Sequence, residues 1–265
     1  MIRSPNSFTG ARREEPVSGP VAGMALWLDA ADASTLFTTA AGSTQSGADD
    51  PVGRWEDKSG DGYHATQSTD TDWRPTRKLS VQNSRDGVLF DGTDDFMSGL
   101  MTGKLSGNNP VTVFCAVNAS SQGSTALARA AWGLGRNPGG NLDRRVALLA
   151  WESASASAIR LYGGFAVFSQ LPLTASVITS LYSGGGGAWQ VFQNGPEKTP
   201  SSSGTGNMNF QSGDYRIGKH SELDVSRDPF HGYVFEVLIY NTALSTGDRQ
   251  ANEAYLAAKW GITLS

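Results

Sequence analysis

The chain has 265 residues and a net charge of −4, and 17% of its residues are charged while 38% are hydrophobic. A protein that binds nucleic acid usually presents a basic face, so this acidic balance argues against a nucleic-acid partner. The length suits one large domain, and the 32 glycines and 11 prolines indicate many tight turns.

The N-terminal segment is polar, contains proline and shows no periodicity. We expect residues 1–22 to form an arm that docks on a partner, followed by a single domain over residues 23–265. No segment reaches the roughly 18 apolar residues that span a bilayer, and the N-terminus lacks the apolar core of a signal peptide. The sequence therefore predicts no membrane insertion.

From Gly23 onward, short apolar alternations are separated by clusters of glycine, serine, asparagine and aspartate. This pattern predicts roughly a dozen strands, at the turn spacing of a two-sheet sandwich or jelly roll. Cys115 lies in one of them and is expected to be a small buried hydrophobe without a disulfide partner. Asn194–Gly195 predicts a hairpin with a type I′ turn. The segments that carry strands are 23–30, 52–67, 87–100, 110–119, 144–152, 158–164, 165–170, 176–184, 188–198, 214–219 and 232–240.

The last stretch of the chain changes from strand to helix. Residues 232–240 alternate with apolar side chains on both faces, which predicts a central strand that is covered on each side. Ser245 and Asp248 form a helix-start pattern, and apolar positions at helical spacing continue to Trp260. A closing seam between this strand and helix is expected from Phe235, Val237, Ile239, Tyr255 and Trp260.

Several of these segments resemble, in order, the concanavalin A-like, laminin-G-like jelly-roll domains that are common in bacteriophage structural proteins and large bacterial surface proteins. The match spans residues 23–262, although residues 118–183 depart freely from the pattern. The resemblance implies an all-β fold of two antiparallel sheets packed face to face, with one C-terminal α-helix at one end. It implies no activity, because this fold hosts many functions. The matching segments are LWLDAADASTL, VGRWEDKSGDGYHATQ, GVLFDGTDDFM, AWQVFQNG, DYRIGK and the final block HGYVFEVLIYNTALSTGDRQANEAYLAAKWGI.

Catalytic patterns are weak in this sequence. Jelly-roll glucanases place their acids on one E-x-D-x-x-E strand, so that two carboxylates flank the scissile bond. The nearest spacing here is Glu222 and Asp224, but Arg227 stands where the third acid is needed, and Glu236 is alone on its strand. The three histidines show no spacing typical of a metal site or a triad. We therefore expect no enzyme activity.

Two acidic turns suggest a Ca²⁺ site. The first offers oxygen side chains at Asp57, Ser59 and Asp61, as in the first half of an EF-hand loop, but the closing glutamate is missing. The second turn, with Asp91, Asp94 and Asp95, could supply further ligands if it lay nearby. The alternative interpretation is that these aspartates accept hydrogen bonds from backbone amides and stabilise tight turns. No other cofactor is indicated.

Glycan binding would need exposed aromatic rings on which sugars can stack. Trp73 and Trp132 lie in polar, glycine- or aspartate-containing loops and are the candidates, whereas Trp27, Trp55 and Trp260 fall in strand and helix segments typical of a core. Either loop tryptophan could instead fold back and cover a sheet edge.

Taken with the resemblance, the sequence predicts a non-enzymatic structural protein of a phage virion, placed on a fibre, tail or capsid surface, and attachment to host-surface glycans is the task that such a position suggests. The arm, residues 1–22, would then bind other virion proteins, and a homotrimer is compatible with this role. Two alternatives stay open: a bacterial carbohydrate-binding module that is secreted or displayed on the cell surface, and a glycan-cleaving enzyme with an unfamiliar site.

Overall fold

The computed structural model of the chain describes residues 19–120, 129–135, 147–151, 158–161, 166–169, 174–187, 189–203, 210, 213–219 and 229–265. Most of the predicted arm, namely residues 1–18, and the acids Glu222 and Asp224 lie outside them.

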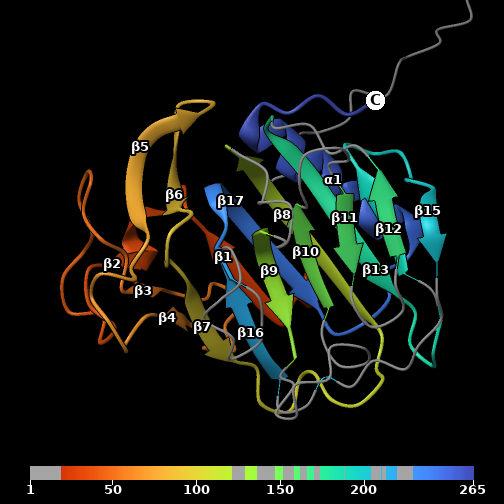
Figure 1. Cartoon of the computed structure of the whole chain (residues 1–265), viewed down its shortest axis with the longest axis horizontal. Coiled ribbons are helices and arrows are strands. Elements are labelled where there is room, and N and C mark those ends of the chain that lie inside the picture. Colours follow the sequence, from red (N-terminus) through yellow and green to blue (C-terminus); the bar gives the residue numbers. More distant parts are fainter. Residues whose placement is uncertain are drawn as a thin grey trace, which may run out of the picture.

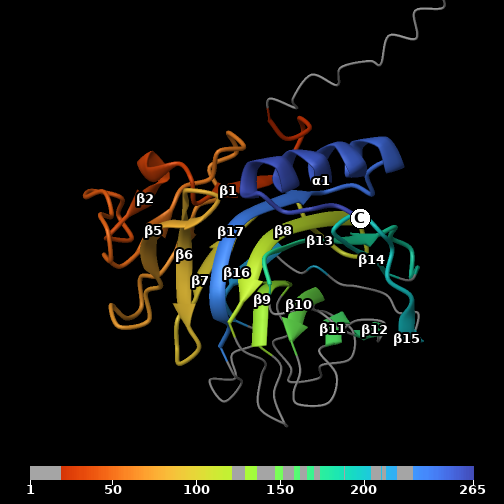
Figure 2. The same ribbon diagram turned by 90° about the horizontal axis from the view of Figure 1, so that it is seen from above.

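Two antiparallel sheets form the body of the protein (Figures 1 and 2). The seven-stranded sheet runs β14 (Trp189–Gln193), β13 (Ser176–Tyr182), β8 (Val111–Ala119), β17 (His231–Tyr240), β6 (Arg85–Asp91) and β5 (Thr76–Gln82), and β1 (Leu26–Asp29) also pairs with β17. The ten-stranded sheet runs β15 (Pro200–Ser203), β12 (Ala166–Ser169), β11 (Ala158–Leu161), β10 (Ala147–Trp151), β9 (Arg129–Leu134), β16 (Asp214–Ile217), β7 (Met97–Leu100), β4 (Ala65–Thr66), β3 (Arg54–Trp55) and β2 (Leu36–Phe37). A 3₁₀ turn, η1 (Ala33–Thr35), precedes β2. The predicted β-sandwich with one C-terminal helix is confirmed.

Strand β17 organises the seven-stranded sheet. It pairs with β8 along its length, with β6 through His231–Val234, and with β1 through Glu236–Ile239. The register shifts between Val234 and Glu236, where the pairing with β6 gives way to the pairing with β1. The last seven residues of β17 are buried, as expected for a strand that is apolar on both faces.

Helix α1 (Thr246–Trp260) lies across the outer face of this sheet (Figure 2). It begins at Ser245, whose Oγ accepts the backbone N–H of Asp248 at 3.2 Å, and it ends at Gly261 with φ 63°. The start and end predicted from the sequence are thus confirmed. None of the helices in the described part of the chain is long and apolar enough to cross a membrane.

The C-terminal end of α1 is held by the hairpin between β5 and β6. Side chains of Asn83 and Arg85 donate to the carbonyl oxygen of Lys259, and Gln82 donates to that of Trp260. The last carbonyls of a helix have no partner inside the helix, so these contacts satisfy groups that would otherwise need water.

Two further sequence predictions are confirmed. Asn194 and Gly195 have φ of 52° and 104°, the left-handed conformation that a type I′ hairpin turn requires at both positions. Cys115 is fully buried in β8 and makes no disulfide.

Candidate functional site

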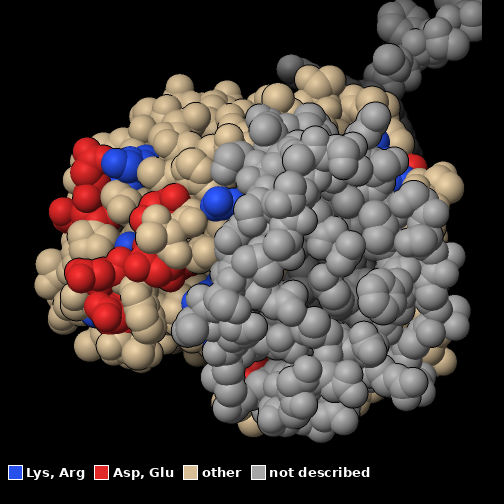
Figure 3. Space-filling model, viewed as in Figure 1, with Lys and Arg blue, Asp and Glu red and all other residues tan. Residues whose placement is uncertain are grey.

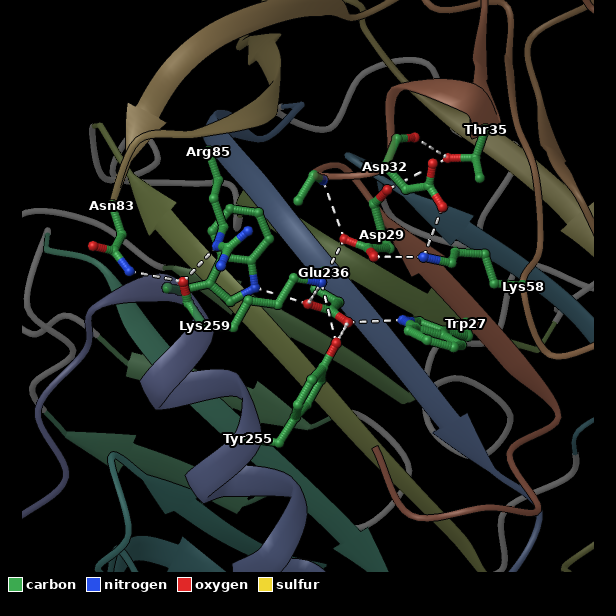
Figure 4. Close-up of polar contacts among 12 residues, drawn as sticks. Trp27, Asp29, Asp32, Thr35, Lys58, Asn83, Arg85, Glu236, Tyr255 and Lys259 are labelled. Atoms are coloured by element: carbon green, nitrogen blue, oxygen red, sulfur yellow. Dashed lines mark hydrogen bonds and ion pairs between the residues drawn. The ribbon is translucent and has the colours of Figure 1, made fainter. Parts of the chain in front are cut away.

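The described residues contain two groups of acidic side chains that differ in their surroundings. The first centres on Glu236, which is fully buried in β17 (Figure 4). Its Oε1 accepts the indole N–H of Trp27 at 2.7 Å and the hydroxyl of Tyr255 at 2.9 Å. Its Oε2 accepts the indole N–H of Trp260 at 2.8 Å and lies 2.7 Å from Nζ of Lys259. Four donors therefore surround one carboxylate, and they come from β1 and from α1.

Asp29 completes this group, because it faces Glu236 across the β1–β17 ladder. Its two oxygens lie 2.6 Å from Nζ of Lys259 and 2.8 Å from Nζ of Lys58. Burial raises the pKa of Glu236, and the negative charge of Asp29 raises it further, whereas Lys259 acts in the opposite direction. Burial alone would lower the pKa of Lys58, but hydrogen bonds to Asp29 and Asp32 raise it.

We call Asp29, Lys58, Glu236 and Lys259, with the tyrosine and tryptophans that bind Glu236, the Glu236 network. Its two buried carboxylates are balanced by two lysines, and every Glu236 oxygen already accepts two donors. A ligand would have to displace buried protein contacts to reach it. The network therefore joins β1, β17 and α1 and leaves no group for chemistry.

The second acidic group lies in the turn from β6 to β7 and reaches from the surface inward, since only 4% of Asp95 is accessible. Ligand oxygens of Asp91, Asp94 and Asp95 all lie within 4.8 Å of one another. Asp95 accepts the backbone N–H of Asp91 at 2.9 Å, and Asp91 accepts that of Thr93 at 2.7 Å. These backbone contacts fit the alternative interpretation of stabilised turns, but Asp91 remains exposed and Asp94 half-buried.

Charge accumulates in this turn. Burial raises the pKa of Asp95 to about 7, and the charges of Asp91 and Asp94 raise it further, although the hydrogen bond from the Asp91 backbone opposes the shift. The pKa of Asp94 is raised by burial and then by Asp91, Asp70 and Asp72, with Lys219 opposing. In Figure 3, acidic side chains gather over the part of the molecule that carries β2–β7.

An aromatic pair lies beside this turn. The ring centroid of half-buried Trp73 is 5.9 Å from that of Phe96, and the carbonyl oxygen of Trp73 accepts the Phe96 N–H at 3.2 Å. Arg216 Cζ and Lys219 Nζ lie 5.2 and 5.1 Å from the Phe96 centroid. We call Asp70, Asp72, Trp73, Asp91, Asp94, Asp95 and Phe96 the Trp73 face.

Polar groups of the ten-stranded sheet continue from this face. Ser98 of β7 pairs in register with Thr66 of β4 and with Arg216 of β16. Met97, Tyr215 and Ile217 point into the core, so their half-buried neighbours Ser98 and Arg216 point outward. Phe96, Ser98 and Arg216 therefore share the outer surface of the sheet.

The structure places the other predicted Ca²⁺ turn apart from the Asp91–Asp95 cluster. Asp57 accepts backbone N–H groups of Trp27 at 2.9 Å, Ser59 at 2.8 Å and Tyr63 at 3.0 Å, and the Ser59 hydroxyl at 2.7 Å. Asp61 pairs with Lys104 at 2.7 Å. Asp57 thus stabilises its turn, and Ca²⁺ binding at Asp57, Ser59 and Asp61, or at the second turn, stays a prediction.

The two predicted glycan-binding tryptophans differ in their exposure. Trp73 is half-buried on the surface, whereas the prediction that Trp132 is exposed is wrong, since only 1% of it is accessible. Trp132 belongs to β9, inside the ten-stranded sheet, where its ring packs in the core. The glycines that follow Trp132 in the sequence indicated a loop, but the structure has a strand at Trp132. Sequence reasoning also missed Asp29 as the partner of Glu236, for which the only signal was an aspartate that ends an apolar strand.

The comparison with known proteins rests on structure, because no family model and no curated protein matches the sequence. A GH54 α-L-arabinofuranosidase matches with a TM-score of 0.62 and 12% identity, over 89% of this chain and 63% of the other. An arabinofuranosidase bound to arabinofuranosyl-α-1,2-xylobiose matches with 0.57 and 13%, over 91% and 60%. Trypanosoma rangeli sialidase matches with 0.55 and 12%, over 93% and 34%. The chain spans about a third to under two thirds of these proteins, and the likeness shows the fold.

These neighbours overturn the predicted function. The expectation of a non-enzymatic phage virion protein is contradicted, since the similar structures are glycoside hydrolases, and they show no link to bacteriophages. At 12–13% identity their likeness shows the fold, and the expectation of no enzyme activity stays a prediction. The sequence resemblance identified the sandwich correctly, but fold likeness alone could not supply the phage association.

Proposed function

We propose that this protein binds carbohydrate through the Trp73 face. The observation that carries the proposal is a half-buried indole that packs on Phe96, in a part of the surface where Asp70 and Asp72, just before Trp73, act on Asp94, just before Phe96. Sugars stack their apolar faces on aromatic rings, and their hydroxyl groups donate hydrogen bonds to carboxylates. The outward Ser98 and Arg216 offer further polar contacts beside the ring.

The fold likeness gives independent support. Glycoside hydrolases with a similar sandwich include one that was solved with arabinofuranosyl-α-1,2-xylobiose. From those proteins we carry over to this chain the ability to bind carbohydrate, without a preference for a particular sugar. The Glu236 network offers no competing site, because its donors and acceptors are consumed inside the protein.

Isothermal titration with a panel of neutral oligosaccharides, including arabinofuranosyl-xylobiose and N-acetylglucosamine hexamer, tests the proposal. We expect at least one of them to bind and Trp73→Ala to weaken that binding by tenfold or more. A nucleic-acid base stacked on an aromatic side chain contributes about 1–3 kcal/mol, and we expect a similar contribution from a sugar ring. Leu79→Ala is the matched control, because it removes another exposed apolar side chain (48% accessible) from β5. Absence of binding, or binding that Trp73→Ala leaves unchanged, contradicts the proposal.

Glycoside cleavage is the second candidate, and the carboxylates of the same turn favour it. The oxygens of Asp91 and Asp95 lie within 4.8 Å of one another, and a retaining mechanism uses two neighbouring carboxyl groups. With its pKa raised to about 7, Asp95 holds a proton that it can give to the leaving oxygen while Asp91 attacks the anomeric carbon. Water then hydrolyses the glycosyl ester and returns the proton to Asp95.

A turnover assay with 4-nitrophenyl glycosides, including the α-L-arabinofuranoside, separates cleavage from binding. If the protein cleaves glycosides, the wild type releases nitrophenol. The rate of release should then fall by a hundredfold or more in Asp91→Asn and in Asp95→Asn. Binding without turnover by the wild-type protein would leave recognition as its function and eliminate this candidate.

A further inference from the structure

The Trp73 face differs from the rest of the described surface in how closely its acids gather. Three acids elsewhere have basic partners: Asp49 lies 2.6 Å from Lys78, Asp61 2.7 Å from Lys104, and Asp86 2.6 Å from Arg77. Glu197 and Asp248 have none among the described residues, but Asp91, Asp94 and Asp95 lie within 4.8 Å of one another and Asp70 and Asp72 act on Asp94. In the part of the chain that the structure describes, no ion pair within 4.0 Å involves any acid of the Trp73 face. Those acids are Asp70, Asp72, Asp91, Asp94 and Asp95.

The cations at this face contact other protein groups. Nη1 of Arg129 donates to the carbonyl oxygens of Gly92 and Pro229 at 3.3 and 3.0 Å. Arg216 and Lys219 both lie over the Phe96 ring, and only 7% of Lys219 is accessible. Burial is the main reason that the pKa of Asp94 is raised, and among the charges Asp91, Asp70 and Asp72 each raise that pKa more than Lys219 lowers it. The field at Asp94 is therefore that of an acidic surface.

A ligand stacked on Trp73 would sit within this field. Asp72 precedes the indole in sequence, and Asp94 lies two residues before Phe96, which supports the ring. An ammonium group on a sugar would be attracted, whereas a carboxylate would be repelled with similar strength. Such discrimination is set by charge and is reduced by salt.

We infer that the Trp73 face selects saccharides by charge, taking glycans that carry free amino groups, such as glucosamine polymers, in preference to neutral ones and rejecting sugars that carry carboxylates. This inference rests on the proposed function and names the substrate class of the same site. It also separates this chain from what the sialidase likeness would suggest, because sialic acid carries a carboxylate. The juxtaposition of one supported indole with unpaired acids is what carries it.

The test compares three hexasaccharides with one backbone: N-acetylglucosamine hexamer, its deacetylated glucosamine form, and an N-succinylated form that carries carboxylates. Dissociation constants are measured by titration calorimetry at low salt and at about 0.3 M salt, at a pH where glucosamine is protonated. We expect the glucosamine hexamer to bind about tenfold more tightly than the neutral hexamer at low salt, and the succinylated hexamer to bind about tenfold more weakly. Both differences should shrink severalfold in high salt.

Two variants place the effect on this face. Asp72→Asn combined with Asp94→Asn keeps the shape of both side chains, and it should reduce the ratio of glucosamine-hexamer to neutral-hexamer affinity about tenfold. Glu197→Gln, which removes an exposed acid at the opposite edge of the seven-stranded sheet, should leave the preference intact. Trp73→Ala should weaken binding of all three hexamers.

The outcomes distinguish the two proposals. If the neutral hexamer binds through Trp73 but the three hexamers have equal affinities, the charge inference fails and carbohydrate recognition stands. A preference that survives in Asp72→Asn/Asp94→Asn, or glucosamine binding that survives in Trp73→Ala, also overturns the inference, because the charge effect would then arise elsewhere. If no saccharide binds, the proposed function fails with it.

Discussion

The Glu236 network and the Trp73 face are both rich in carboxylates, but the carboxylates of the network form buried ion pairs and, in the described part of the chain, those of the Trp73 face do not. In the network, Asp29 and Glu236 are buried and matched by two lysines, so the charges join β1, β17 and α1. On the Trp73 face, exposed Asp91, half-buried Asp94 and buried Asp95 gather within 4.8 Å of one another, and none of them forms an ion pair among the described residues. Both lie along one strand, because β17 pairs with Asp91 at His231 and carries Glu236 five residues later. Partnered acids hold this fold together, and unpartnered acids are available to a ligand.

The largest effect should come from Glu236→Ala. Removing it leaves the Tyr255 hydroxyl and the indole N–H groups of Trp27 and Trp260 without their acceptor, and Lys259 with Asp29 alone, which costs about 3–5 kcal/mol of unfolding free energy. Urea unfolding followed by circular dichroism measures this. Glu197→Ala, an exposed acid, should change the unfolding free energy by less than about 0.5 kcal/mol. A Glu236→Ala cost below about 1 kcal/mol would mean that the network does not hold the helix.

Trp260→Ala tests the other side of the same contact. Trp260 is fully buried, stacks on Phe235 at 5.0 Å and donates to Glu236, so we expect a loss of about 3 kcal/mol. The midpoint of denaturant unfolding measures it. A change below about 1 kcal/mol would show that α1 is not docked on the sheet, contrary to the structure.

The pH dependence of stability separates the surface turn from the network. The pKa of Asp95 is about 7 in the folded protein and about 3.9 when unfolded. A raised pKa favours the folded state at low pH, and this stability is lost as pH rises through about 7. Allowing for solvent screening, the loss is about 1–2 kcal/mol. Asp95→Asn should remove that loss, so the variant gains stability relative to the wild type at about pH 8 but not at about pH 4.

Thermal unfolding of both proteins across this pH range gives the comparison. Burial also raises the pKa of Glu236, but Glu236 contributes equally to the wild type and to Asp95→Asn. The difference in stability between the two proteins therefore isolates Asp95. A constant difference across the range would contradict the raised pKa of Asp95.

The smallest effect on stability should come from Trp73→Ala. The ring is half-buried and packs mainly on Phe96, so we expect a loss of about 1 kcal/mol or less in unfolding free energy. Saccharide binding should nevertheless be lost, which is the reverse of the pattern for Trp260→Ala. A loss of several kcal/mol would make Trp73 part of the core and undo the contrast between the two regions.

The sequence predicted the parts of this fold that depend on local patterns. Strand 232–240 and the helix Thr246–Trp260 follow from periodicity and a capping pair, and Asn194–Gly195 from turn chemistry. It did not predict that Asp29 faces Glu236, because the two are distant in sequence and meet only through strand pairing. Trp132 was misplaced for a similar reason, since burial of a ring depends on the sheet that packs against it.

The proposed function depends on the indole of Trp73 meeting a sugar, and NMR of the tryptophan side chains observes this directly. In a ¹⁵N-labelled protein titrated with glucosamine hexamer, the indole N–H signal of Trp73, assigned through Trp73→Phe, should shift progressively to saturation. The signals of Trp132 and Trp260, whose rings are buried, should stay in place. A Trp73 signal that does not move while binding is detected by calorimetry would contradict a carbohydrate site on the Trp73 face.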